Sequence, residues 1–276
     1  MDLNQTYSDL KTNFPNLEIY QNHPLAPYTT VKIGGPADIF IHTTSSNDFT
    51  KILKYLSHQP ITIIGNGSNV LISDSGISGI VIKNNSKEIE ILPNNQVKVA
   101  SGVQLSTLIN FTLDHNLLGL EEFSYIPSTI GGAIAGNIHG DNKTLFSEFV
   151  DSIKEYNDFI ISAVLKLKPG NSTFAKQKTK EIIQKKSAIQ PMNSLGSVFK
   201  NIEGKDPTGM IIDQQLNLKG FSIGDAQISP THANFIINNG HTTAIDYFNL
   251  IQLIQSKAQE ILGFQFELEI KLLGEF

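Results

Sequence analysis

The sequence lacks three residue types entirely: cysteine, tryptophan and arginine. Without cysteine, the chain has no disulfide, no thiolate metal ligand and no cysteine nucleophile. Without arginine, no side chain offers the planar fork that binds a carboxylate or a phosphate through two parallel hydrogen bonds. All 21 basic residues are therefore lysines, whose ammonium groups act as point charges.

Strong positive charge and long apolar runs are missing as well. The net charge is −5 and no basic run occurs, which argues against a nucleic-acid partner. No apolar stretch approaches the length of a membrane span, and the N-terminal sequence resembles no signal peptide, so we expect no membrane contact and a cytoplasmic location. The seven histidines show no ligand spacing, so no metal site is expected.

The 276 residues, of which 40% are hydrophobic, are enough for two modest domains. Their spacing predicts an α+β fold with many short strands, a helix over residues 45–59 and a long helix from Thr243 to about Leu262. A loop near Pro169-Gly170 separates two differently patterned halves. We therefore expect one domain over residues 1–169, with subdomains of about 1–85 and 86–169, and a second over 170–276.

Three glycine-rich segments interrupt the strands. Gly65 to Asn69 stand between the strand-like runs Ile61–Ile64 and Val70–Ile72, and because no helix follows, the dinucleotide fingerprint and the P-loop are both excluded. This segment is either an ordinary hairpin turn or a nest of N–H groups for an anion. Similar segments follow residue 28 and residue 125, and the three together indicate an extended phosphate-bearing ligand.

Six segments occur in the order found in the UDP-N-acetylenolpyruvoylglucosamine reductase (MurB) family, and the chain resembles that family over nearly its whole length. They are "YTTVKIGGPADI", "IIGNGSNVLISDSGISGIVI", "GLEEFSYIPSTIGGAIAGN", "GSVFKN", "HANFIIN" and "FELEIKLLG". The resemblance implies an FAD-binding fold of the vanillyl-alcohol-oxidase (PCMH) type over residues 1–169, followed by an α+β substrate-binding lobe.

The resemblance also implies the reaction. NADPH gives a hydride to FAD, and the reduced flavin reduces the enolpyruvyl group of a UDP-sugar to give UDP-N-acetylmuramate. Such an enzyme is an oxidoreductase of peptidoglycan synthesis, and so of cell wall biogenesis, cell shape and cell division. We expect a monomer whose partners are the UDP-sugar and the two cofactors, FAD and NADPH.

Individual residues carry the resemblance. Ser197 matches the proton-donating serine of the family and Glu269 its catalytic glutamate, although Glu267 shares the strand face with Glu269 and spacing alone does not separate them. Lys200 and Asn201 match positions that meet the substrate. The matching cofactor positions are Thr30, Gly34, Gly35, Gly65, Asn66, Gly67, Ser68, Asn69, Ile126, Pro127, Ser128, Gly131, Gly132 and Asn137.

Some neighbouring residues have a less certain assignment. Lys185 and Lys186 stand where the family often has basic residues, but solvated surface positions are the commoner role for lysines. His139 replaces a small residue of the flavin segment and is a candidate contact to the cofactor.

One family motif is missing. The family places a catalytic arginine in a Tyr-Arg-x-Ser strand before the segment that here reads "LKLKPG", and this interval is too short to contain it. Either Val150 occupies the arginine position, or a strand pair is lost between Ile153 and Lys154, with residues 154–167 as the strand that leaves the gap. We favour the loss. Lys154 could then supply a point charge without the fork geometry.

The absence of the arginine motif leaves three hypotheses for the function. The first is the reductase, impaired by the missing arginine. The second is a non-catalytic flavin-binding protein, and the third, which has least support, is a flavin oxidase with another substrate. The carboxyl-terminal motifs favour the reductase because they match its substrate lobe.

Overall fold

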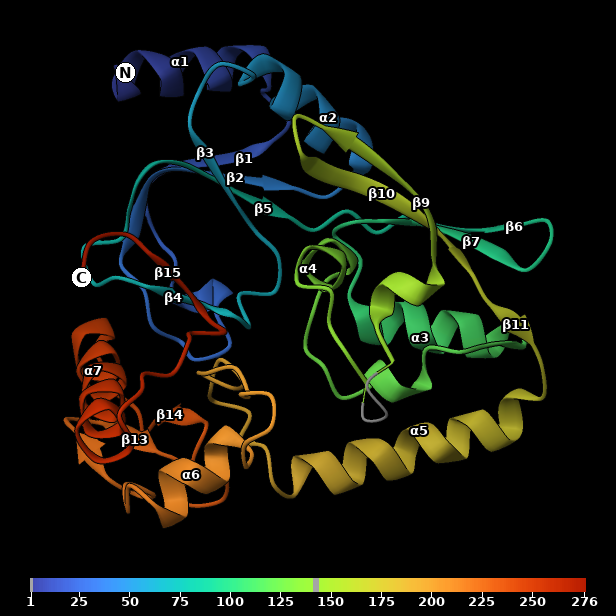
Figure 1. Cartoon of the computed structure of the whole chain (residues 1–276). Helices are drawn as coiled ribbons and strands as arrows, with labels where there is room; N and C mark the ends of the chain where they lie inside the picture. Colours follow the sequence, from blue (N-terminus) through green and yellow to red (C-terminus); the bar gives the residue numbers. More distant parts are fainter. Residues whose placement is uncertain (1, 141–143) are drawn as a thin grey trace. The chain divides into compact units, whose positions relative to one another are not determined.

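The computed structural model describes residues 2–140 and 144–276 and divides into two compact units (Figure 1). Both units are built from separate stretches of the chain. Unit 1 consists of Met1–Gln21, Ile39–Asn66 and Gly79–Lys186, and unit 2 of Asn22–Asp38, Gly67–Ser78 and Ser187–Phe276. The chain therefore passes from one unit to the other inside the first predicted flavin loop, between Asn66 and Gly67.

The first sheet has the strand order β1-β2-β5-β3, with β3 parallel to β5, and most of its residues belong to unit 1. Helix α2 begins where Ser45 accepts a hydrogen bond from the Asp48 N–H, and it buries Phe49, Ile52 and Leu53 against this sheet's core cluster. The elements are α1 (Leu3–Asn13), β1 (Glu18–Pro24), β2 (Pro36–Thr43), α2 (Ser46–Tyr55), β3 (Ile61–Ile64) and β5 (Ile77–Asn84).

The second sheet of unit 1 has the order β6-β7-β10-β9 and is antiparallel. Its buried side chains, such as Val99 and Leu165, pack with those of α3 and α4 in a second core cluster. The elements are β6 (Ile89–Leu92), β7 (Gln96–Ala100), α3 (Leu105–Asp114), β8 (Leu117–Leu118), η2 (Glu121–Phe123), α4 (Ile130–Ala135), η3 (Phe146–Phe149), β9 (Val150–Tyr156), β10 (Phe159–Lys166), β11 (Lys168–Pro169) and α5 (Ser172–Ser187).

The hairpin of β9 and β10 corrects one sequence-based prediction. β9 continues through Ile153 and Lys154 to Tyr156, so the expectation that one strand ends at Ile153 and the next begins at Lys154 is wrong. The turn consists of Asn157 and Asp158, with φ values of 48° and 64°. Positive φ at both positions is the geometry of a two-residue hairpin turn, which asparagine and aspartate adopt at low cost.

The long helix α7 packs one face into the core of unit 2, where its side chains Tyr247, Leu250 and Ile254 are buried. β13 pairs with β12 and β14, and β15 lies parallel to β4. The elements are η1 (Ala26–Tyr28), β4 (Val70–Ile72), α6 (Thr208–Gln214), β12 (Ser222–Ile223), β13 (Ala226–Ile228), β14 (Ile236–Asn238), α7 (Ala244–Leu262) and β15 (Lys271–Leu273).

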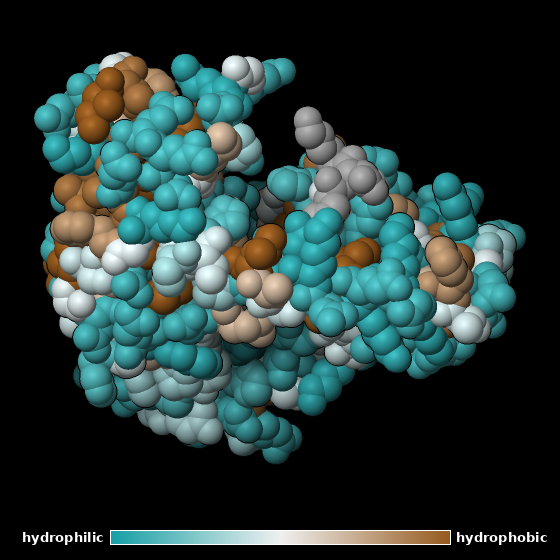
Figure 2. Space-filling model, turned by 90° about the horizontal axis from the view of Figure 1, so that it is seen from below, coloured by the Kyte–Doolittle hydropathy of each residue, from teal (hydrophilic) through white to brown (hydrophobic). Residues whose placement is uncertain are grey.

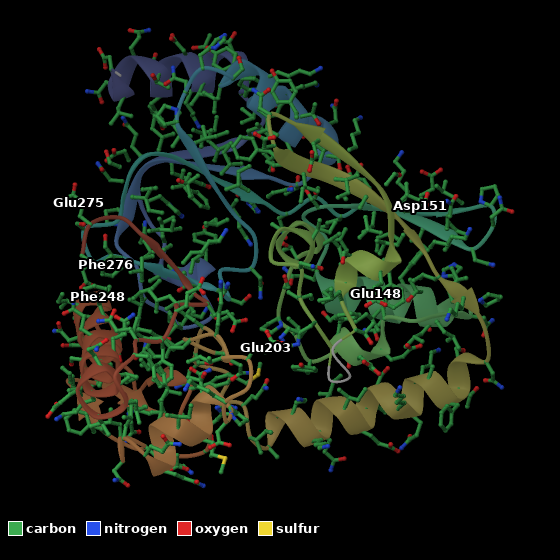
Figure 3. The ribbon with its side chains drawn as sticks, viewed as in Figure 1. Glu148, Asp151, Glu203, Phe248, Glu275 and Phe276 are labelled. Atoms are coloured by element: carbon green, nitrogen blue, oxygen red, sulfur yellow. The ribbon has the colours of Figure 1, made fainter. Side chains whose placement is uncertain are left out.

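Local sequence signals set the ends of α7. Thr243 and Asp246 form a capping box at its start, and Gly263, at φ 77°, ends it, so the predicted helix is confirmed. The Asp74 carboxylate also accepts hydrogen bonds from the Ala244 and Ile245 N–H groups, at 2.8 and 3.1 Å, which ties the chain after β4 to the helix. At the chain end, Phe276 packs on Phe248 with 5.0 Å between ring centroids (Figure 3).

The surface is mostly polar on the face drawn in Figure 2, where hydrophobic residues form small separate groups. Phe174 and Met192 are the most exposed large hydrophobic side chains of the described residues. None of the helices in the described ranges combines the length and the apolar character that a bilayer crossing requires.

Candidate functional site

The loop Gly67–Asn69 is held closely against the segment around Thr30 in unit 2. The Thr30 N–H donates to the Gly67 carbonyl at 3.1 Å. Gly67 has φ 63°, and a Cβ at this residue would lie 2.8 Å from the Thr29 Cα and overlap the Tyr28 carbonyl oxygen. This packing requires glycine twice over, once for the backbone angle and once for the space.

The N–H groups of Gly67, Ser68 and Asn69 donate to no acceptor among the described residues. A strand-to-strand turn whose consecutive N–H groups have no protein partner can hold an anion, as a nest does. The loop therefore fits the phosphate-bearing part of a flavin dinucleotide. Of the two alternatives left open by the sequence, the tight hairpin does not apply, because β3 and β4 lie in different sheets.

The second glycine-rich segment predicted for the cofactor, from Pro127 to Gly132, lies in unit 1. The Asn66 side-chain amide donates to the Pro127 carbonyl at 2.8 Å, and a Cβ on Gly65 would lie 2.5 Å from the Thr129 Oγ1. The glycines Gly131 and Gly132 stand in the first turn of α4, which the sequence did not predict. Residues 65–66 and 127–132 are thus brought together within unit 1.

The N–H groups of these two glycines already have acceptors. Gly131 donates to the Ser101 carbonyl at 2.8 Å, and Gly132 donates to the Thr129 Oγ1 at 3.3 Å. A Cβ on Gly131 would lie 3.0 Å from the Ser101 Cβ. The two glycines therefore permit close packing of α4, and their contact with the cofactor stays a prediction.

The segment that carries Ser197 is fixed by a buried asparagine that sequence analysis missed. Asn234 is 4% exposed, and its carbonyl accepts from the Val198 N–H at 2.8 Å. Its side chain accepts from the Phe199 N–H at 3.1 Å and donates to the Phe199 carbonyl at 2.8 Å. Its only signal in the sequence is a polar residue inside the apolar run "HANFIIN". Ser197 itself is half-buried, directly before this anchored pair.

Glu269 lies just before β15, outside the strand predicted for it, in a segment that an isolated antiparallel bridge joins to the Ser197 segment. Its N–H donates to the Val198 carbonyl at 2.9 Å, and the Phe199 and Leu268 positions pair in a β-bridge. The Glu269 carbonyl accepts from the Asn69 side-chain amide at 3.1 Å. Within unit 2, therefore, Glu269 has the Ser197 segment on one side and the predicted flavin loop on the other.

The register of this pairing also distinguishes Glu267 from Glu269. The Lys200 N–H donates to the Glu267 carbonyl at 2.9 Å, so Glu267 lies opposite Lys200, with which its carboxylate forms an ion pair. Glu269 lies two residues closer to Ser197, opposite Val198. Position along the strand pair thus agrees with the family register in favouring Glu269 as the catalytic group.

The two predicted substrate residues line a cavity of about 500 Å³ in unit 2. Asn201 uses its side-chain oxygen to cap α6, accepting from the Thr208 N–H at 2.9 Å, and its NH₂ group remains available as a donor. Lys205 lies over the Phe264 ring at 4.6 Å. The other lining residues are Lys200, Ile202, Gln265 and Glu267.

The remaining predicted cofactor residues have structural partners of their own. The Thr30 hydroxyl donates to the Ser194 carbonyl at 2.6 Å, and the Gly35 N–H donates to the Ser73 carbonyl at 2.8 Å. Asn137, at φ 38°, accepts from the Ser147 N–H at 3.3 Å. The Ser128 hydroxyl donates to the Thr129 carbonyl, Ile126 is half-buried, and Gly34 has φ 140°.

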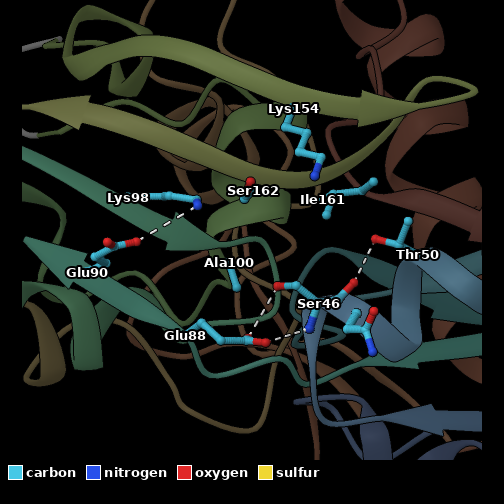
Figure 4. Close-up of a pocket in the computed structure, with 10 residues that line it drawn as sticks. Ser46, Thr50, Glu88, Glu90, Lys98, Ala100, Lys154, Ile161 and Ser162 are labelled. Carbon is cyan, nitrogen blue, oxygen red and sulfur yellow. Dashed lines mark hydrogen bonds and ion pairs between the residues drawn. The ribbon is translucent and has the colours of Figure 1, made fainter. Parts of the chain in front are cut away.

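The other residues that the sequence singled out lie elsewhere in unit 1: Lys185, Lys186, His139 and Lys154. Lys186, the penultimate residue of α5, has its ammonium 4.7 Å from the Tyr125 ring centroid, and Lys185 is exposed beside it. His139 pairs with Leu145 in a β-bridge. Lys154 lines a cavity of about 460 Å³ near the start of α2, where Glu88 accepts from the Ser46 N–H at 2.7 Å (Figure 4). None of the predicted flavin or substrate residues lines that cavity.

A buried lysine is the second residue that sequence analysis missed. Lys83, the penultimate residue of β5, is 8% exposed, and its ammonium donates to the Gly65 carbonyl. Burial lowers the pKa of Lys83 to about 8. A lysine in the otherwise apolar run "GIVIK" was the available signal.

Known proteins match both parts of the chain. The sequence model of the UDP-N-acetylenolpyruvoylglucosamine reductase C-terminal domain matches residues 188–273, and that of an FAD binding domain matches residues 37–157. The reductase of Caldanaerobacter subterraneus subsp. tengcongensis is 34% identical, with 94% of each chain covered. That of Listeria monocytogenes serotype 4a is 34% identical over 298 positions, with 97% of this chain and 99% of the relative covered.

A solved structure matches as well. The crystal structure of the reductase (MurB) from Thermus caldophilus superposes with a TM-score of 0.78 at 26% identity, covering 94% of this chain and 99% of the other. The alignment with the Listeria protein extends over 298 positions, whereas this chain has 276 residues, so at least 22 positions of the alignment face gaps in this chain.

Proposed function

The chain belongs to the UDP-N-acetylenolpyruvoylglucosamine reductase family, and we propose that it reduces UDP-N-acetylenolpyruvoylglucosamine to UDP-N-acetylmuramate with NADPH and FAD. Bound FAD would supply the chemistry of hydride transfer from NADPH to the enolpyruvyl double bond. One observation carries the proposal: within unit 2, Glu269 is joined to the Ser197 segment by a backbone hydrogen bond to Val198, and to the loop Gly67–Asn69 by a hydrogen bond from the Asn69 side-chain amide.

Ser197 and Glu269 are the proposed acid–base groups. After hydride addition, the carbon next to the substrate carboxylate must gain a proton, and the Ser197 hydroxyl is the proposed donor. A hydroxyl is a weak acid, so we propose that a second group, Glu269, shares the proton transfer; its backbone N–H bonds to Val198 and its backbone carbonyl to the Asn69 side chain. The NH₂ group of Asn201 and the ammonium of Lys200 line the cavity proposed for the UDP-sugar.

The missing arginine sets the expected rate. Removing one preorganised donor from such a site commonly costs about 10² to 10³ in rate. The cationic groups of the substrate cavity, Lys200 and Lys205, are lysines, and Lys200 already pairs with Glu267. We therefore propose a working but slow reductase.

An anaerobic stopped-flow experiment tests the proposal. We expect NADPH to bleach the flavin absorbance near 450 nm, about where oxidised flavins absorb, and the enolpyruvyl substrate to restore it. Bleaching without recovery would show that the second half-reaction is absent, in favour of a non-catalytic flavin protein. Rapid recovery with oxygen in place of the substrate would instead indicate an oxidase.

A pair of substitutions tests the choice between the two glutamates. We expect Glu269→Gln to slow flavin reoxidation by the substrate about 10²-fold, the lower end of what a positioned acid–base group contributes. The comparison variant, Glu267→Gln, removes the exposed ion pair with Lys200 in the lining of the proposed substrate cavity, so we expect it to change the KM for the UDP-sugar and to leave flavin reoxidation at saturating substrate close to the wild-type rate. Equal losses in both variants would contradict the assignment of Glu269.

The proposal extends to the setting of the enzyme. We propose that residues 1–169 form the FAD-binding region and residues 170–276 the substrate lobe, as the sequence indicates. The enzyme would act as a monomer in the cytoplasm, where NADPH is available, and its product would enter peptidoglycan synthesis, on which cell shape and division depend. Two family matches support this division into an FAD-binding region and a substrate lobe. The FAD binding domain matches residues 37–157, and the reductase C-terminal domain matches residues 188–273.

A further inference from the structure

Lys83 is a buried charge without a counter-charge. It lies in β5, between the neighbouring strands β2 and β3, and only 8% of it is exposed. Among the described residues it forms no ion pair, and its ammonium donates a single hydrogen bond, to the Gly65 carbonyl. A buried ammonium in this state is costly, because one carbonyl does not replace the water and counter-ions that it gives up.

The one partner of this ammonium opens the predicted flavin loop. Ile64, the last residue of β3, lies opposite Lys83 in the parallel register, and Gly65 follows it directly. The next residue, Asn66, is bonded to the Pro127 carbonyl at 2.8 Å. The ammonium thus lies where β3 ends and where two of the segments assigned to the cofactor meet within unit 1.

Resting on the proposed flavin-dependent function, we propose that Lys83 is a positioning residue of the flavin site, whose ammonium fixes the Gly65 carbonyl and supplies a buried positive charge that the pyrophosphate of FAD neutralises. The burial that lowers the pKa of Lys83 to about 8 is the cost of keeping this charge uncompensated in the free protein. Binding of a dianion beside Gly65, within unit 1, would remove that cost, and so part of the binding free energy of FAD would depend on Lys83.

A purely structural role makes a different prediction. If Lys83 only satisfied the Gly65 carbonyl, its removal would destabilise the flavin-free protein, and FAD binding would weaken only as a consequence. If Lys83 stores uncompensated charge, its removal leaves the flavin-free protein equally or more stable, because replacing a buried charge by an apolar group of similar length is often favourable. The stability of the free protein and its affinity for FAD then change in opposite directions.

The test uses two variants and a control, all stripped of flavin. Lys83→Met removes the charge and the hydrogen bond, and Lys83→Gln keeps a donor but removes the charge. Lys87→Met removes an exposed lysine of the same unit. FAD dissociation constants follow from quenching of flavin fluorescence, and melting temperatures of the flavin-free proteins from circular dichroism.

We expect Lys83→Met and Lys83→Gln to raise the FAD dissociation constant at least about tenfold, as expected for a lost buried charge contact. Melting of the flavin-free Lys83→Met protein should be unchanged or higher, and Lys87→Met should match the wild type in both measurements. Wild-type affinity in Lys83→Gln, or parallel losses of melting temperature and affinity in Lys83→Met, would overturn the inference while the reductase proposal stands. Failure of the wild-type protein to bind FAD would overturn both.

Discussion

Replacement of Ser197 by alanine is expected to slow reoxidation of the reduced flavin by the enolpyruvyl substrate by about 10² to 10⁴, the range contributed by a positioned acid or base. The hydride can still be delivered, but the adjacent carbon has lost its proposed proton donor. The backbone around Ser197 does not depend on the hydroxyl, because Asn234 holds Val198 and Phe199 through their peptide groups. The substitution should therefore remove the chemistry and leave the segment in place.

The first half-reaction is the internal control for this experiment. Reduction of the flavin by NADPH needs no proton from Ser197, so its rate in Ser197→Ala should equal that of the wild type. Both rates come from the same anaerobic stopped-flow traces at the flavin band. A variant that loses both half-reactions in proportion would indicate a damaged flavin site, and one that keeps both would remove Ser197 from the mechanism.

The regular elements could be predicted from the sequence because their signals are local. Helix α7 ends where Thr243, Asp246 and Gly263 place it, and those residues lie within the helix or next to it. The β-branched run Ile61–Ile64 likewise forms a strand. The glycine-rich loop after it was left open between a hairpin turn and an anion nest, and only its occurrence with two similar segments indicated a ligand. The resemblance to a known family supplied the roles of Ser197 and Glu269, which no spacing rule could have supplied.

The interactions that fix the site could not be predicted, because they join residues distant in the sequence. Asn69 reaches Glu269 across 200 positions, and Asp74 caps a helix 170 positions away. Asn234 and Lys83 are buried polar groups inside apolar runs, where local patterns predict only a strand. Their roles depend on which backbone group of another segment lies within hydrogen-bond distance.

The hairpin of β9 and β10 shows the limit of reasoning from an absent motif. Because the family motif was missing, the sequence favoured the loss of a strand pair between Ile153 and Lys154, with residues 154–167 as the strand that follows. The chain instead continues the strand and closes it with Asn157 and Asp158, two residues that accept positive φ. A shortened interval is thus accommodated by a tight turn, without an interrupted strand.

Gly67 is the position in the loop where one added methyl group is expected to do most damage. In Gly67→Ala the new Cβ would overlap the Tyr28 carbonyl oxygen and lie 2.8 Å from the Thr29 Cα, and both neighbours are backbone atoms that no side-chain rotation can move. The loop must then separate from the Thr30 segment and lose its hydrogen bond to the Thr30 N–H. Overpacking of this kind lowers the free energy of unfolding by about 1 to 3 kcal/mol. The left-handed backbone angle lowers it further, by about 1 to 2 kcal/mol.

Gly204→Ala is the matched control, because Gly204 also lies in unit 2, at φ 75°, and nothing lies within 4 Å of its Cβ position. In urea unfolding, the free energy of unfolding of Gly204→Ala should fall only by the cost of the left-handed backbone angle. This control should bind FAD like the wild type. Gly67→Ala should also bind FAD about 10²-fold more weakly, since about 2.7 kcal/mol of displaced loop contacts corresponds to that factor. If the two variants lose the same stability and both keep their affinity for FAD, the free N–H groups of Gly67, Ser68 and Asn69 are not the anion site.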